Sequence, residues 1–311
     1  MKIIAFFNSK GGVGKTALVY HLASMYAQLR MSVLAVDLDP QANLTCAFLP
    51  EERLEELWPE GRHPLTIHGA VEPVMSGLGD VADPHVEEID SHLGLVPGDL
   101  ALCSIEDILA KARPLSEWSE GDNSQVTAFH RAIARAARSR QAELVLADVG
   151  PGLGAISRSA VMAADDVVIP IAPDLFALQS LRGMGPRLRE WRASGQELRP
   201  LGYVVMQHAV RRDRPAGANM RWMNEIPAEY RRSILATGTV PGMRSADDEH
   251  CLAALGHYRS LLPLAEAARK PMFLLKPADG AIGAHGDAVR DCYREFESLA
   301  NKIAGLASRD R

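Results

Sequence analysis

The chain has 311 residues, of which 47% are apolar and 23% charged, enough to bury the core of one large α/β domain. Its longest apolar runs, such as residues 3–7, are far shorter than the roughly 20 residues that span a bilayer, and no secretory leader is recognisable before the first strand. The four cysteines form no C-x-x-C pair, which disfavours a zinc site, a disulfide framework and an iron–sulfur cluster within one chain. We therefore expect a cytoplasmic globular protein.

Predicted strands and helices alternate along the chain. A short apolar strand at residues 2–8 is followed by a glycine-rich turn and by a helix in which apolar residues recur at helical spacing. A second strand at residues 32–39 ends in two aspartates before Pro40. Further strands are predicted at residues 94–97, 143–149, 167–172 and 201–206. Apolar, β-branched runs between helices predict an α/β fold with a mostly parallel, twisted sheet and helices on both faces.

Two regions depart from this alternation. Residues 50–90 are richer in Pro, Gly, His and acidic residues and predict an irregular insertion with short helices. Residues 287–306 place apolar side chains on one face and predict a C-terminal amphipathic helix that docks on the core. A membrane-binding tail is the less favoured alternative, because acidic residues dilute the basic face that anionic lipid requires. We expect a single domain over residues 1–311.

The turn after the first strand, residues 9–16, reads S-K-G-G-V-G-K-T. Glycines let consecutive backbone N–H groups converge on a phosphate, and the following helix presents its positive end. The stretch approximates the P-loop pattern G-x-x-x-x-G-K-[ST], with Ser9 in place of the first glycine. In that pattern Lys15 meets the β- and γ-phosphates and the Thr16 hydroxyl ligates Mg²⁺. Lys10 is a second lysine, which one phosphate site does not require.

Aspartates close two of the predicted strands. Ligands of open parallel sheets lie outside the carboxyl ends of the strands, so these side chains are candidates for the same site. Asp148 ends an apolar strand, as the metal-side aspartate of nucleotide hydrolases does, and leads into a glycine-rich loop at residues 150–154 suited to sensing a γ-phosphate. Asp37 and Asp39 lie two residues apart on a strand and therefore share one face. The P-loop and these aspartates, in this order along the chain, predict a binding site for a nucleotide with its Mg²⁺.

Four segments carry a family resemblance. They are KGGVGKT (residues 10–16), DLDPQAN (residues 37–43), LVLADVGPGLG (residues 144–154) and VVIPIAPDLFALQSLRGM (residues 167–184). Together they resemble the ParA branch of the ParA/MinD family of P-loop ATPases, whose Walker A motif is of the deviant type. The resemblance runs nearly end to end and includes residues 285–304, which are similar to the last helix of ParA-like proteins. Since the first strand begins at residue 2, we expect the short form without an N-terminal DNA-binding extension.

The resemblance implies the P-loop NTPase fold and a Mg²⁺-dependent ATPase of weak intrinsic activity. In this family the early lysine, here Lys10, reaches across a dimer interface to the ATP of the partner subunit. Two facing triphosphates bring a large negative charge into a dry interface, and a lysine donated in trans offsets it. The implied catalytic residues are Lys10, Lys15 and Asp39, and Asp39 orients the attacking water. The implied metal-site residues are Thr16, Asp37 and Asp148. The implied nucleotide-binding residues are Lys10, Gly11, Gly12, Val13, Gly14, Lys15, Thr16 and Ala17.

The distribution of arginine residues along the chain bears on which macromolecules the protein binds. Residues 181–244 contain twelve arginines and five acidic residues, a local charge of +7 in a chain of net charge −5. Such a segment is as consistent with a solvated helix face as with a polyanion-binding surface. The resemblance implies an ATP-bound homodimer that binds DNA non-specifically, with Arg211, Arg212 and Arg214 as the best candidates for the contacts. It also implies a ParB-like or other activator protein, a plasmid, chromosome or protein complex as cargo, and a nucleoid location in the ATP state.

Two alternatives remain open. A MinD-like membrane-cycling ATPase requires a basic amphipathic tail and predicts retention on liposomes. A metabolic P-loop enzyme, such as an amide-forming ligase, or a cluster carrier, requires a small-molecule acceptor or paired cysteines. Retention on random-sequence DNA with ATP alone would favour the ParA-like interpretation.

Overall fold

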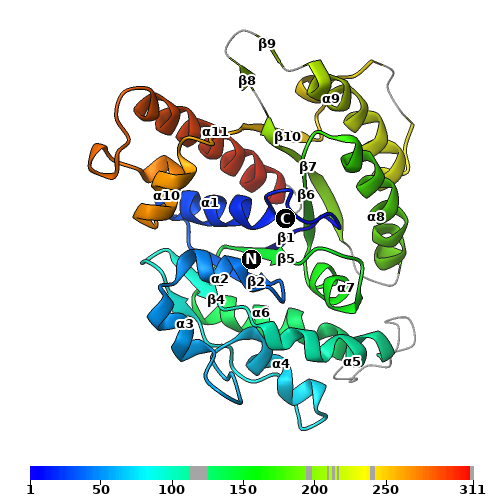
Figure 1. Ribbon diagram of the computed structural model, residues 1–311. Helices are drawn as coiled ribbons and strands as arrows, with labels where there is room; N and C mark the ends of the chain where they lie inside the picture. Colours follow the sequence, from blue (N-terminus) through cyan, green and yellow to red (C-terminus); the bar gives the residue numbers. More distant parts are fainter. Residues whose placement is uncertain are drawn as a thin grey trace.

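The computed structural model describes residues 1–112, 125–193, 198–208, 210–211, 214–215, 217–238 and 242–308. Its centre is an eight-stranded sheet, shown in Figure 1. The strand order is β10-β7-β6-β1-β5-β2-β4-β3, in which β3 runs antiparallel to β4 and the other neighbours run parallel. Its strands are β1 (Lys2–Phe6), β2 (Val33–Leu38), β3 (Glu87–Glu88), β4 (Leu93–Val96), β5 (Leu144–Val149), β6 (Asp166–Ile171), β7 (Arg199–His208) and β10 (Cys251–Gly256). A separate two-stranded ribbon consists of β8 (Val210–Arg211) and β9 (Arg214–Pro215).

Helices cover both faces of this sheet, as the sequence pattern predicts (Figure 1). The α-helices are α1 (Lys15–Gln28), α2 (Asn43–Phe48), α3 (Glu51–Leu57), α4 (Ile67–Met75), α5 (Glu106–Lys111), α6 (Ala128–Ser139), α7 (Ala155–Met162), α8 (Leu175–Ala193), α9 (Gly217–Tyr230), α10 (Leu262–Ala268) and α11 (Ala284–Ala307). Short 3-10 helices lie at Leu100–Ile105, Gln125–Thr127, Ser245–Asp247, Met272–Leu274 and Pro277–Asp279, and a π-helical turn at Arg231–Leu235 follows α9.

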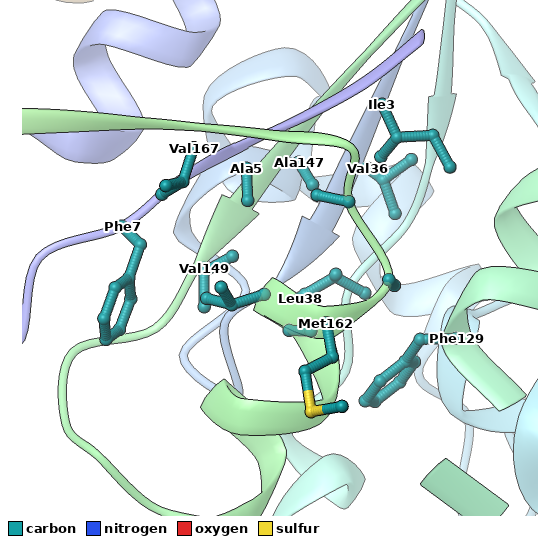
Figure 2. Close-up of a cluster of buried hydrophobic side chains, with 14 of the residues drawn as sticks. Ile3, Ala5, Phe7, Val36, Leu38, Phe129, Ala147, Val149, Met162 and Val167 are labelled. Carbon is teal, nitrogen blue, oxygen red and sulfur yellow. The ribbon is translucent and has the colours of Figure 1, made fainter. Parts of the chain in front are cut away.

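The side chains of β1 alternate between two cores. Ile4 and Phe6 lie in the core that the sheet forms with α1 and α11. Ile3 and Ala5 lie in the core formed with α4, α6, α7 and α8, part of which Figure 2 shows. All four side chains are at most 1% exposed, as expected for a parallel strand buried on both faces. This burial fixes the direction of β1 and with it the position of the loop that follows.

The strand order brings the aspartates of the sequence motifs together. β1 lies between β5 and β6, and β2 lies next to β5. Asp148 of β5 pairs with Asp37 of β2 on one side and with Phe6 at the end of β1 on the other. The glycine-rich loop and both aspartate-bearing strand ends therefore meet at one edge of the sheet.

The predicted sheet is confirmed, and the predicted strands are present as β1, β2, β4, β5, β6 and β7, with ends within two residues of those expected. Residues 50–90 contain α3, α4 and the two-residue strand β3, and the C-terminal helix is α11. The sequence pattern does not predict β10, CLAALG, because alanine has a low preference for strands. It becomes a strand by pairing with β7.

Candidate active site

The loop between β1 and α1 has the backbone shape of a phosphate-binding loop. Gly12 and Gly14 have φ angles of 72° and 90°, in the left-handed region that other residues rarely adopt. A Cβ atom at Gly14 would also lie 3.1 Å from Cε of Met206. Helix α1 begins directly afterwards at Lys15, so its first N–H groups have no partner within the helix and are available to an anion above the loop.

Asn8 anchors this loop to β6 and α8. Its Nδ2 donates to the Pro170 carbonyl at 2.7 Å, and its Oδ1 accepts the Lys10 N–H at 2.9 Å and the Ser180 hydroxyl. The Ser9 and Ser180 hydroxyls are 3.1 Å apart. The P-loop pattern predicts none of these contacts, because Ser180 is distant in the sequence. They hold the phosphate-binding loop independently of the loop that follows β5.

The two P-loop lysines occupy different environments. Lys15 is 6% exposed, and its Nζ lies 3.4 Å from the Lys10 carbonyl. Burial lowers the pKa of Lys15, while the charge of Asp148 acts in the opposite direction. Nζ of Lys10 instead donates to Oδ2 of Asp174 at 2.5 Å and lies 5.3 Å from the centre of the Phe176 ring. Lys15 therefore faces the phosphate site, whereas Lys10 is turned to the loop after β6.

Asp148 is fully buried, and among the residues that the structure describes neither of its carboxylate oxygens has a hydrogen-bond partner. Burial raises the pKa of Asp148 well above the usual range, and the charge of Asp37 adds to the rise, whereas the nearby Thr16 hydroxyl and Lys15 act against it. Two unpartnered carboxylate oxygens beside a threonine hydroxyl are hard oxygen donors of the kind that Mg²⁺ prefers. The donor set therefore fits Mg²⁺, which Asp148 and Thr16 would hold when a nucleotide is bound.

The two aspartates at the end of β2 are held in different ways. Oδ2 of Asp37 accepts the N–H and the hydroxyl of Thr45 at 2.8 Å each, and Oδ1 accepts the Asp39 N–H at 3.2 Å. Burial raises the pKa of Asp37 to about 6, and these hydrogen bonds limit the rise. Oδ1 of Asp39 accepts the Gln41 N–H at 2.9 Å, and a Cβ atom at Gly150 would lie 3.0 Å from this oxygen. Asp39 therefore lies close to the loop after β5, and the metal role of Asp37 stays a prediction.

Two cavities meet at the start of α1. The smaller, about 380 Å³, is lined by the P-loop glycines, Asp39 and Pro151. The larger, about 470 Å³, lies between α1, α2 and α10, and Tyr20 forms part of its wall. Thr16 and Ala17 belong to the walls of both cavities. Their position over the P-loop and their sizes fit the triphosphate and the nucleoside of one nucleotide.

Known proteins have sequences similar to that of this chain. Residues 1–197 match the family model described as an AAA domain. The chromosome-partitioning ATPase Soj of Thermus thermophilus is 30% identical over 212 residues, which cover 66% of this chain and 69% of Soj. The virulence plasmid ParA family protein pGP5-D of Chlamydia psittaci is 28% identical over 243 residues, which cover 76% of this chain and 80% of that protein. The chain belongs to the ParA/MinD family of P-loop ATPases.

Solved structures share the fold of this ParA/MinD ATPase. An ATP complex of McdA from Cyanothece superposes with a TM-score of 0.68 at 16% identity, covering 98% of this chain and 96% of that one. Cobyrinic acid a,c-diamide synthase from Mycobacterium smegmatis, with ADP and magnesium bound, gives 0.54 at 24% identity, covering 73% and 81%. Identities this low show the fold alone. With its family established by sequence, the chain is an ATP hydrolase whose ligands are ATP and Mg²⁺.

The candidate DNA-binding arginines of this ParA/MinD ATPase are partly outside the described residues. Arg211 and Arg214 lie in the β8–β9 ribbon that follows β7, and Arg212 is not among the described residues. Most of the other arginines that the structure describes in residues 181–244 form ion pairs. These pairs are Arg182–Glu229, Arg187–Glu190, Arg199–Asp166, Arg221–Glu225, Arg231–Asp248, Arg232–Glu229 and Arg244–Asp247. Much of the local positive charge is thus neutralised within the fold.

Proposed function

We propose that this chain is a ParA-type positioning or segregation ATPase. It forms a homodimer when both subunits hold ATP, and the dimer binds DNA without sequence preference. A ParB-like or other activator protein stimulates its slow hydrolysis, and the cargo is a plasmid, a chromosome or a protein complex. It works in the cytoplasm and associates with the nucleoid in the ATP state. Support comes from the family and from relatives that are named as chromosome-partitioning and plasmid ParA proteins.

The position of Lys10 carries this proposal. A lysine that served its own phosphate site would face the cavity beside Lys15, but Lys10 is turned outward to Asp174. Next to this ion pair, Leu175 and Phe176 are 49% and 59% exposed. A detachable cation beside exposed apolar side chains suits contact with a second subunit, whose triphosphate receives the lysine. A charge supplied in trans makes the dimer conditional on ATP in both subunits.

Within each subunit the remaining residues have separate tasks. Lys15 and the P-loop N–H groups bind the phosphates, while Thr16 and Asp148 hold Mg²⁺, which neutralises charge that develops on the phosphates. Asp39 orients the attacking water. Adenosine occupies the larger cavity, beside Tyr20. Phosphoryl transfer needs mainly positioning and charge neutralisation, so turnover stays slow until a partner supplies further stabilisation.

The packing of the C-terminal helix favours DNA over a membrane as the surface to which the ATP-bound dimer binds. Among the residues that the structure describes, no helix is both long and apolar enough to span a bilayer. The apolar face of α11 is used inside the fold, where Phe296, Leu299 and Ile303 are at most 3% exposed. The Tyr26 hydroxyl of α1 donates to the Ala300 carbonyl at 2.9 Å. A MinD-like cycle through this helix would require it to leave the core first.

The test is retention on random-sequence DNA with ATP, with ADP and without nucleotide, over a range of salt concentrations. We expect retention with ATP alone, falling steeply with salt because phosphate contacts release counterions. Lys10→Ala should bind ATP, remain a monomer and lose DNA. Arg211→Ala and Arg214→Ala should dimerise but bind DNA more weakly. Arg187→Ala is the matched control, since its partner Glu190 already neutralises this exposed arginine.

Two outcomes would contradict the proposal. The first is DNA retention that does not depend on the nucleotide. The second is a Lys10→Ala protein that dimerises and hydrolyses ATP like the parent. Retention of the ATP form on anionic liposomes instead of DNA would support the MinD-like alternative.

A further inference from the structure

Glu106, the first residue of α5, caps the N-terminus of a different helix. Its Oε1 accepts the N–H of Ala155 at 2.5 Å, and its Oε2 accepts the N–H of Ile156 at 2.9 Å. These two residues begin α7, whose own N-cap position is Gly154 and provides no capping side chain. Glu106 therefore supplies both the acceptors and the negative charge that a helix N-terminus favours.

The Glu106 carboxylate, and not an unusual backbone conformation, explains the glycine at position 154. Its φ of −74° and ψ of −176° are extended values that any residue adopts. A Cβ atom there would lie 2.6 Å from Oε1 of Glu106, which is shorter than any normal contact. Glycine at this position makes room for the side chain of Glu106.

Helix α7, which Glu106 caps, directly follows the loop that reaches the nucleotide site. Residues 150–154 connect β5 to α7, and Pro151 lines the phosphate cavity. A Cβ atom at Gly150 would lie 3.0 Å from Oδ1 of Asp39, so the loop passes close to this carboxylate. The loop therefore lies beside Asp39 at one end and is held by Glu106 at the other.

We propose that Glu106 is a positioning residue for ATP hydrolysis. By fixing the start of α7, it holds residues 150–154 against Asp39, so that Asp39 is oriented toward the attacking water. A second bond reinforces the clamp, because the Arg158 guanidinium of α7 donates to the Leu109 carbonyl of α5 at 2.9 Å. The inference rests on the proposed role of Asp39 and does not depend on DNA binding.

The clamp acts on the rate of the reaction more than on ATP affinity. The phosphate-binding loop is anchored through Asn8 to β6 and α8, and these bonds do not involve α7. Loss of the Glu106 carboxylate should therefore leave the ATP-binding groups in place while Asp39 loses its support. A residue that acts in this way lowers kcat and leaves KM nearly unchanged.

The first experiment measures steady-state ATP hydrolysis by the full chain with saturating Mg²⁺. We expect Glu106→Ala to lower kcat about tenfold with KM for ATP within about twofold of the parent. Glu106→Gln offers one acceptor oxygen instead of two, should give an intermediate kcat, and serves in place of the alanine variant if that variant does not fold. Asp107→Asn removes the neighbouring exposed acid of the same helix turn and should keep the parental kcat.

The second experiment uses Gly154→Ala. The added methyl group displaces the Glu106 carboxylate, so we expect a fall in kcat similar to that of Glu106→Ala. In the Glu106→Ala background the same substitution should have little further effect, because the space is then empty. A general loss of stability would instead make the two effects add.

The inference is overturned by a parental kcat in Glu106→Ala, by a KM that rises as much as kcat falls, or by additive effects in the double variant. Asp39→Asn, measured in parallel, separates this failure from that of the proposed function. A parental rate in Asp39→Asn removes the proposed role of Asp39 itself. An inactive Asp39→Asn protein beside a fully active Glu106→Ala protein refutes the role of Glu106 alone.

Discussion

At the residue scale, a fully buried carboxylate without a hydrogen-bond partner lowers the stability of a folded protein, because its lost hydration is not replaced. Within the described part of the chain Asp148 is such a group, and Asp37 lies beside it on the neighbouring strand. Lys15 compensates only part of this cost. The same unpartnered oxygens are suited to Mg²⁺ and its bound water. Asp148 therefore lowers the stability of the fold but supplies oxygen atoms suited to binding Mg²⁺.

Asp148→Asn should separate the two effects. The amide has the same shape and carries no charge, so we expect the free energy of unfolding without nucleotide and Mg²⁺ to rise by about 1 kcal/mol at pH 7. Mg²⁺-dependent hydrolysis should fall about 10- to 100-fold. Denaturant unfolding and ATPase assays measure both, with the exposed Asp247→Asn as control. A less stable Asp148→Asn protein would show that the carboxylate is compensated in the parent.

At the element scale, His21 joins α1 to the C-terminal part of the chain. Its Nδ1 lies 2.7 Å from the Ala17 carbonyl, its Nε2 lies 3.2 Å from the backbone nitrogen of Met272, and its ring stacks on Phe296 at 5.0 Å. A neutral ring with its proton on Nδ1 satisfies both polar contacts, whereas a second proton would face the Met272 N–H. Burial lowers the pKa of His21 to about 4, in agreement with this geometry.

The His21 contacts predict a loss of stability in acid. Its pKa is about 4 in the folded chain and about 6.5 in the unfolded chain, so the unfolded chain takes up the proton first as the pH falls. The stabilisation that depends on a neutral His21 is complete above pH 6.5. Between pH 6.5 and pH 4 it is lost, and the free energy of unfolding falls by about 3 kcal/mol. His21→Asn should be less stable at pH 7 but lose less stability over this range. Denaturant unfolding at several pH values measures this change in stability, with a substitution of the half-buried His285, His285→Asn, as control. The prediction is contradicted if the stabilities of the parent and of His21→Asn depend equally on pH.

The elements also show what the sequence could and could not predict. Central strands are buried on both faces, so they read as short apolar runs, and the motif residues at their ends mark the nucleotide site. Pairs formed between distant segments leave no such pattern. Arg199 pairs with Asp166 through the neighbouring strands β6 and β7, and Glu106 meets Ala155 through the packing of α5 on α7. Such contacts follow from the assembled fold, which is why the charge count of the arginine-rich segment overstates its free positive charge.

For the whole molecule, the proposed dimer requires Lys10 to leave Asp174. Their side chains are 28% and 41% exposed, so solvent screens the ion pair and each pair contributes roughly 0.5 kcal/mol. Two pairs are broken when two subunits join. The ion pairs therefore oppose dimerisation by about 1 kcal/mol in total, a small amount that shifts the equilibrium without blocking it.

Asp174→Asn should strengthen the ATP-dependent dimer, because the amide keeps the shape of the side chain and no longer holds Lys10 by charge. We expect its dimer Kd to fall about fivefold with saturating ATP and Mg²⁺, as measured by sedimentation over a range of protein concentrations. Glu190→Gln makes the same change of charge at an exposed pair on α8 and should leave Kd unchanged. A weaker dimer in Asp174→Asn would mean that Asp174 orients Lys10 toward the partner's nucleotide instead of withholding it. The double variant with Lys10→Ala decides between the two, since an effect of Asp174 that acts through the lysine disappears when the lysine is absent.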